Sequence, residues 1–119
     1  MITTVTGKNQ ITIPTALARE LDTDSASKTA LLGLTRALAL ELAPDRITVN
    51  GLSPGPFATE MNTALMQNPE LNQQFLLKIP VGRWGRVEEV GHLALYLCSE
   101  KAGFLTGTDI VIDGGWTTQ

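Results

Sequence analysis

The sequence has very few of the residues that build metal centres and disulfides. Its 119 residues include one cysteine, Cys98, and one histidine, His92. A single cysteine excludes an internal disulfide, and we expect Cys98 to be a small buried apolar side chain rather than a reactive thiol. Because no histidine, cysteine and carboxylate residues cluster at ligand spacing, the sequence predicts no metal site. We expect His92 to lie on the polar side of a helix.

Charge and long apolar runs are also limited. Charged residues make up 18% of the chain and the formal net charge is −3, which argues against a dedicated nucleic-acid binder, although a local patch could still exist. No apolar run reaches the roughly 18 uncharged residues of a membrane span, and no cleavable signal pattern is present. With 43% hydrophobic residues, the chain suits one globular domain, and we expect it to be cytoplasmic.

The first 21 residues read as two short strands and a helix. Alternating β-branched residues favour strands at 2–6 and 10–13, with a turn at 7–9 between them. Pro14 suits the first turn of a helix, which continues over 15–21. These residues therefore predict a strand–turn–strand–helix segment.

A long helix follows at 29–42. It is apolar on most faces, which predicts burial on more than one side, and Pro44 marks its end. It either continues the preceding helix or is separated from it at 23–25, and the poor helix formers at 23–25 favour a break. The rest of the pattern predicts a strand at 46–52, helices at 62–66, 69–77 and 86–99, a loop at 80–85, a strand at 108–112 and a turn at 113–115.

Strands that alternate with helices predict a parallel sheet with right-handed crossovers, and hence an α/β fold. The strand before the first crossover must come from residues 3–6 or 10–13. A sheet of so few strands has two open edges that are difficult to cover within one chain. We therefore expect strands or helices of neighbouring chains to pair.

Several separated motifs carry a family resemblance. They are Asp24-Ser-Ala-Ser-Lys28 with the helix that follows, Arg46-Ile-Thr-Val-Asn-Gly-Leu-Ser-Pro-Gly-Pro-Phe-Ala-Thr59, Pro80-Val-Gly-Arg-Trp-Gly-Arg-Val-Glu-Glu-Val90 and Thr106-Gly-Thr-Asp-Ile-Val-Ile-Asp-Gly-Gly-Trp116. In order and spacing they resemble the C-terminal half of the short-chain dehydrogenases/reductases, over residues 24–119. The resemblance implies a partial Rossmann-like three-layer unit with a short parallel sheet, added N-terminal strands and completion by oligomerisation.

The resemblance also implies chemistry at particular positions. In the family, the tyrosine of Tyr-x-x-x-Lys passes a proton to or from the substrate oxygen while NAD(P) exchanges hydride. The lysine lowers the pKa of the tyrosine and binds the nicotinamide ribose. Lys28 stands at the lysine position and is the candidate catalytic and cofactor-binding residue. The same resemblance places a loop at the nicotinamide end of the cofactor through Pro54, Gly55, Phe57 and Thr59, and makes 57–79 the substrate lid.

The chain departs from the family pattern in two ways. Asp24 stands at the tyrosine position, and with an ordinary pKa of about 3.9 it is ionised at pH 7 and has no proton to donate. Asp24 and Lys28 also suit a plain helix N-cap with an i,i+4 ion pair. No glycine-rich phosphate turn of the G-x-G-x-x-G kind occurs. We therefore expect the isolated chain not to bind NAD(P) and to be inactive as an oxidoreductase.

The first 23 residues resemble a different family. Their strand, turn, strand-Ile-Pro and helix are similar to the first half of the AbrB-type swapped-hairpin DNA-binding domains. We therefore divide the chain into an AbrB-like segment at 1–23 and a dehydrogenase-like domain at 24–119. A DNA-binding regulator or antitoxin is the alternative function, although Lys8 and Arg19 are the only cations that this segment offers to phosphates. A recombined structural protein without activity is a third.

The long apolar helix and the last helix–strand unit form the main subunit interfaces in the dehydrogenase family. Both are present, so we expect a homo-oligomer, a dimer or a tetramer. The remaining polar and aromatic candidates have structural explanations. We interpret Glu88 and Glu89 as favourable charges at a helix N-terminus rather than an acid–base pair. Trp84 and Trp116 are interpreted as packing or interface residues.

Overall fold

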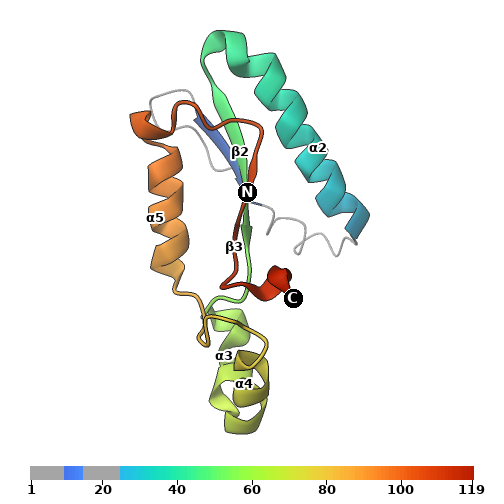
Figure 1. Cartoon of the computed structure of the whole chain (residues 1–119), viewed down its shortest axis with the longest axis vertical. Helices are drawn as coiled ribbons and strands as arrows, with labels where there is room; N and C mark the ends of the chain where they lie inside the picture. The colour runs from blue at the N-terminus through green and yellow to red at the C-terminus, as the bar shows by residue number, and fades with distance from the viewer. Residues whose placement is uncertain (1–9, 15–24) are drawn as a thin grey trace. The chain divides into compact units, whose positions relative to one another are not determined.

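The computed structural model describes residues 10–14 and 25–119 (Figure 1). Contacts divide the chain into two compact units. Of the described residues, unit 1 contains 10–14, 25–53 and 93–110, and unit 2 contains 54–92 and 111–119. Within the described chain, every helix is too short or too polar to cross a lipid bilayer.

A parallel sheet is the centre of unit 1. Its strands are β1 (Gln10–Pro14), β2 (Thr48–Pro54) and β3 (Asp109–Ile112), in the order β1-β2-β3. β1 runs parallel to β2, with Gln10 opposite Thr48 and Pro14 opposite Leu52. The predicted α/β class and the predicted strand at 10–13 are therefore confirmed. The other proposed strand, 3–6, lies outside the described residues.

Helix α2 (Ser25–Leu42) packs on this sheet and forms its core. Ala39 of the helix and Val49 of β2 are buried against each other, with partly buried side chains around them: Leu31, Leu38, Leu42 and Ile47. Figure 1 shows the C-terminal end of α5 on the opposite side of the strands from α2. The sheet of unit 1 is thus covered from both faces, as α/β folds require.

The end of α2 follows the sequence closely. The helix stops at Leu42 and is followed by a short 3-10 turn, Ala43–Asp45, because Pro44 has no N–H to continue the α-helical ladder. Arg46 then adopts a left-handed backbone conformation with φ 59°. This conformation explains why β2 begins at Thr48 rather than at the predicted residue 46. Residues 15–24 lie outside the described chain, so the proposed break at 23–25 stays a prediction.

Unit 2 contains the short helices of the predicted lid. They are a 3-10 turn at Glu60–Asn62, α3 (Thr63–Gln67) and α4 (Pro69–Leu76). α4 begins where predicted, because the side chain of Asn68 caps it by accepting a hydrogen bond from the N–H of Leu71 at 3.2 Å. In this part of the described chain, neither α3 nor α4 has a buried side chain.

The last elements are α5 (Val87–Leu97) and two 3-10 turns, Glu100–Ala102 and Trp116–Thr118. α5 ends before the predicted residue 99, where the Ser99 hydroxyl instead donates to the carbonyl of Tyr96 at 2.6 Å. Cys98 is half-buried rather than fully buried, and His92 is exposed as predicted.

Candidate functional site

The predicted site residues come from both units. Lys28 lies in the first turns of α2 in unit 1, and Asp24 lies outside the described residues. Pro54 is the last residue of β2, and the loop that follows it belongs to unit 2. The contacts that position the loop residues 55–59 therefore lie within unit 2.

Gly55 is fixed against the end of β3. Its N–H donates to the carbonyl of Ile112 at 2.9 Å. A Cβ on Gly55 would lie 2.4 Å from the Cβ of Asp113 and 2.7 Å from its Cα. Only glycine allows such a close approach of two backbones. The sequence requires glycine here for packing, whatever the loop binds.

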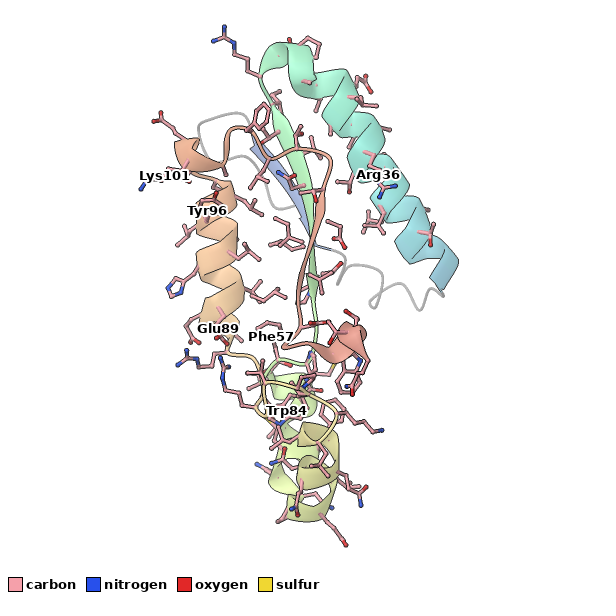
Figure 2. The ribbon with its side chains drawn as sticks, viewed as in Figure 1. Arg36, Phe57, Trp84, Glu89, Tyr96 and Lys101 are labelled. Carbon is pink, nitrogen blue, oxygen red and sulfur yellow. The ribbon has the colours of Figure 1, made fainter. Side chains whose placement is uncertain are left out.

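Phe57 is the buried anchor of the loop. Its side chain is 7% exposed, and a Cβ on Gly85 would lie 2.6 Å from the Phe57 ring. The backbones also pair: Gly85 N–H donates to the Pro56 carbonyl at 2.9 Å, and Ala58 N–H donates to the Gly85 carbonyl at 2.8 Å. The loop is thus fastened along its length to the segment around Gly85, with the Phe57 ring directed into the protein (Figure 2).

Thr59 is the last residue of the loop. Its side chain is exposed, and it precedes the 3-10 turn Glu60–Asn62. Asn62 holds this end of the loop, because its Nδ2 donates to the Phe57 carbonyl at 2.7 Å and its N–H donates to the Thr59 carbonyl at 3.0 Å. The sequence motifs did not single out Asn62. Its position three residues after Thr59 was the one signal that the sequence offered for it.

A cavity of about 200 Å³ lies beside the loop in unit 2. Phe57 and Gly85 line one part of it, and an ion pair between Arg83 and Glu89 lines another. The guanidinium donates to both carboxylate oxygens, from Nη1 to Oε2 at 2.9 Å and from Nη2 to Oε1 at 2.7 Å. Such two-pronged contacts fix the direction of both side chains.

Glu89 also completes the start of α5. Its Oε2 accepts a hydrogen bond from the N–H of Arg86 at 2.7 Å. The hydrogen bonds from Arg83, and then the one from Arg86, lower the pKa of Glu89 from 4.5 to about 2. The interpretation of Glu89 as a favourable charge at a helix N-terminus was incomplete, because its first partner is Arg83 from the preceding loop.

Asp113 organises the C-terminal turn. Its Oδ1 accepts from the N–H of Gly115 at 2.9 Å, while Oδ2 accepts from the N–H of Thr117 at 2.9 Å and from the Thr117 hydroxyl at 2.7 Å. These hydrogen bonds, led by the one from the Thr117 hydroxyl, hold the pKa of Asp113 below its usual value. Both carboxylate oxygens of Asp113 therefore accept hydrogen bonds from residues of the C-terminal turn.

The other candidates behave as packing residues or surface residues. Trp84 and Trp116 are half-buried and both contact Phe75. Within the described chain, no three histidine, cysteine or carboxylate side chains are grouped as metal ligands would be. The loop from Pro54 to Thr59 is held in place by backbone hydrogen bonds to Ile112 and Gly85, and it borders the cavity through Pro56 and Phe57.

A parallel sheet flanked by helices, with a glycine-containing loop at the end of β2, defines a partial Rossmann-type unit. A family model described as enoyl-(acyl carrier protein) reductase matches residues 15–117. The chain belongs to the short-chain dehydrogenase/reductase family.

Individual relatives agree with this assignment. Over 91 residues the chain is 43% identical to the 3-oxoacyl-(acyl-carrier-protein) reductase of Aquifex aeolicus, covering 76% of this chain and 36% of that protein. It is 47% identical over 91 residues to the acetoacetyl-CoA reductase of Rhizobium meliloti, covering 76% and 37%. The solved structure of 4-hydroxyisoleucine dehydrogenase complexed with NADH superimposes with a TM-score of 0.81 at 32% identity, over 94% of this chain and 48% of that one.

Two limits follow from these matches. The chain spans little more than a third of the length of the curated relatives it matches, 36% and 37% for the two named. The family match begins at residue 15, inside the segment 1–23, and the comparisons do not support the AbrB-type resemblance of that segment. The predicted boundary between residues 23 and 24 lies outside the described residues and stays a prediction.

Proposed function

We propose that this chain forms the nicotinamide side of an NAD(P)-dependent oxidoreductase of the short-chain family, and that by itself it does not catalyse hydride transfer. The observation that carries the first part is the loop from Pro54 to Thr59, which unit 2 holds in one conformation through Gly55 and Phe57. Preorganised backbone is what a binding loop needs, because the entropy of ordering it is not lost on binding.

The loop residues fit the nicotinamide end of a dinucleotide. Gly55 fixes the start of the loop against the end of β3, and the Thr59 side chain is exposed at the end of the loop. When bound, the dinucleotide supplies or accepts the hydride. In this proposal the Thr59 hydroxyl and the loop backbone orient the carboxamide, and Lys28 binds the ribose through its ammonium. The NADH named with 4-hydroxyisoleucine dehydrogenase supports this cofactor class.

The second part of the proposal rests on Asp24. Proton transfer to or from a substrate oxygen needs a group that holds a proton near working pH, and a carboxylate with an ordinary pKa of about 3.9 has none at pH 7. The i,i+4 ion pair that the sequence predicts between Asp24 and Lys28 would also weaken the positive charge available to the ribose. The 119 residues contain no glycine-rich phosphate turn, which removes the contacts that anchor the pyrophosphate.

Turnover and cofactor titration test both parts. We expect no oxidation of NADH or NADPH by the chain with acetoacetyl-CoA or simple ketones, and no change in tryptophan emission at millimolar cofactor. Turnover that Lys28→Met abolishes would overturn the proposed inactivity. Asp24→Tyr is the matched variant. If this variant turns over substrate and the unmodified chain does not, Asp24 is the cause of the inactivity and the missing glycine turn is not.

We further propose that the chain assembles with copies of itself. Apolar side chains remain exposed on α2, with Leu34 at 50% and Leu40 at 80%, and Phe104 after α5 is 103% exposed. Exposed apolar patches of this kind favour association. Light scattering should report a dimer or tetramer, and Leu34→Lys with Leu40→Lys should shift it toward smaller species. A monodisperse, folded monomer of the unmodified chain would contradict this proposal.

No observation on the described residues favours the DNA-binding alternative. The strand that the AbrB-type resemblance would place in a swapped barrel is β1, and β1 pairs with β2 in the dehydrogenase-like sheet. If a mobility-shift series nevertheless gave binding that weakens steeply with salt, real phosphate contacts would exist and the alternative would have to be reconsidered.

A further inference from the structure

Three aromatic side chains form a continuous stack in unit 2. The ring of Phe75 lies between two indoles, with its centroid 4.6 Å from that of Trp84 at an interplanar angle of 5° and 5.0 Å from that of Trp116 at 29°. Each ring comes from a different segment: Phe75 from α4, Trp84 from the loop before α5, and Trp116 from the C-terminal 3-10 turn. We call these three residues the aromatic clamp.

Polar contacts support the clamp at both ends of α4. The indole Nε1 of Trp84 donates to Oδ1 of Asn72 at 2.8 Å, near the start of the helix. After the helix, Nε2 of Gln119 donates to the carbonyl of Lys78 at 2.5 Å. The loop that supplies Trp84 therefore also holds α4 by a hydrogen bond, and the C-terminal segment that supplies Trp116 is bonded to the chain just after α4.

The clamp matters because α4 has little else to hold it. Neither α4 nor the neighbouring α3 buries a side chain in this described part of the chain, and Leu71 on α4 is 48% exposed. Elements with few buried contacts open at low free-energy cost. The contacts that fix such an element then decide how often it opens, and for α4 they include the two ring contacts of Phe75 and the hydrogen bond from Trp84 to Asn72.

Trp84 connects the clamp to the loop from Pro54 to Thr59. Trp84 is followed directly by Gly85, whose N–H and carbonyl are both hydrogen-bonded to that loop, at Pro56 and Ala58. The Phe57 ring lies against Gly85 as well, so closely that a Cβ there would be 2.6 Å from the ring. Trp84 is therefore joined through Gly85 to the backbone that positions the loop, and Figure 2 labels both Trp84 and Phe57.

We propose that the aromatic clamp is a latch for α4: the helix swings free only when the stack on Phe75 separates, and separation loosens the Pro54–Thr59 loop through Gly85. Trp84 is in this view a positioning residue, since it acts on the loop through Gly85 and not through contact with a ligand. The latch is a property of unit 2 and holds whether or not the chain catalyses a reaction.

Amide hydrogen exchange of the whole chain tests the latch. In Phe75→Ala the backbone amides of α4 should exchange about tenfold faster, because two ring contacts are lost. Leu71→Ala is the matched control: it shortens an exposed side chain on the same helix outside the stack, and exchange should stay within about twofold of the unmodified chain. Tryptophan emission should shift to longer wavelength in Phe75→Ala alone.

Trp116→Ala keeps the proposal testable if Phe75→Ala does not fold. It removes one outer ring of the stack and should also speed exchange of α4, although residue 116 is far from α4 in the sequence. The amide of Ala58, which donates to Gly85, reports the coupling to the loop and should exchange faster in both variants. Unchanged α4 exchange in either folded variant would overturn the latch, and faster α4 exchange with an unchanged Ala58 amide would overturn the coupling.

Discussion

Gly55 and Asp113 approach so closely that a Cβ on Gly55 would stand 2.4 Å from the Cβ of Asp113. The contact joins the first residue after β2 to the first residue after β3, and the Gly55 N–H to Ile112 hydrogen bond lies beside it at 2.9 Å. The loop predicted to meet the nicotinamide therefore leaves the sheet at a point where no side chain fits.

Gly55→Ala should destabilise unit 2 by about 1–3 kcal/mol, because the added methyl group must push two backbones apart. Urea denaturation monitored by tryptophan emission measures the loss. Gly91→Ala on α5 is the matched control: a Cβ there meets nothing within 4 Å, and replacing glycine in a helix interior should stabilise by about 0.5–1 kcal/mol. Equal effects of the two substitutions would show that the close approach is relieved without cost.

Asn50→Ala should destabilise unit 1 by about 1–3 kcal/mol. The side chain of Asn50 is buried on β2, and its Nδ2 donates to the carbonyl of the half-buried Leu105 at 2.8 Å, so truncation leaves this carbonyl without its donor. Gln67→Ala is the control, because it shortens an exposed amide side chain on α3. Comparing the thermal unfolding midpoints of the two variants separates the loss of the buried hydrogen bond from the general cost of shortening an amide. A midpoint equal to that of Gln67→Ala would contradict the argument.

The order of elements could be predicted from the sequence, because it depends on local patterns. Period-two alternation located β2, the short segment 10–13 was one of two strands offered for β1, and Pro44 located the end of α2. The error at the start of β2 came from Arg46, whose left-handed conformation is not encoded by hydrophobic periodicity. An arginine at this position gives no turn signal as a glycine would.

The contacts that build the site could not be predicted in the same way. Arg83 lies on a loop and Glu89 on a helix, so no repeat within a single helix or strand brings them together. Trp84, Phe75 and Trp116 meet because three separate segments fold together. The family resemblance gave the position of Phe57, but only the structure shows that its ring is buried on Gly85.

Glu89→Gln should remove part of the acid sensitivity of unit 2. Hydrogen bonds from Arg83 and Arg86 lower the folded-state pKa of Glu89 from 4.5 to about 2, so the ion pair stabilises the fold above pH 4.5 and this contribution is lost as pH falls toward 2. Thermal midpoints measured between these pH values should fall less steeply for Glu89→Gln than for the unmodified chain. Glu88→Gln leaves the Arg83–Glu89 pair intact and is the control. Parallel pH profiles for all three proteins would contradict the role of the pair.

Asp113→Asn should loosen the C-terminal turn and, through Trp116, the clamp on α4. The carboxylate accepts from the N–H groups of Gly115 and Thr117 and from the Thr117 hydroxyl, and an amide at this position presents a donor to one of these donors. We expect the Thr117 amide to exchange about tenfold faster in Asp113→Asn at pH 7. Because the pKa of Asp113 is held below its usual value, the same loosening should appear in the unmodified chain only as acid protonates this carboxylate.

Thr117→Val separates the contribution of the Thr117 hydroxyl from that of the backbone N–H groups that donate to Asp113. It removes the hydroxyl donor to Oδ2 and leaves the two backbone donors in place, so its effect on the Thr117-position amide should be smaller than that of Asp113→Asn. If Asp113→Asn speeds exchange at residue 117 but leaves α4 unchanged, the turn is stabilised by the carboxylate while Trp116 holds its place on Phe75 without it. If exchange becomes faster both at residue 117 and in α4, the Asp113 carboxylate stabilises the turn and the clamp together. This is the result expected from the contacts that run from Asp113 through Thr117 and Trp116 to Phe75.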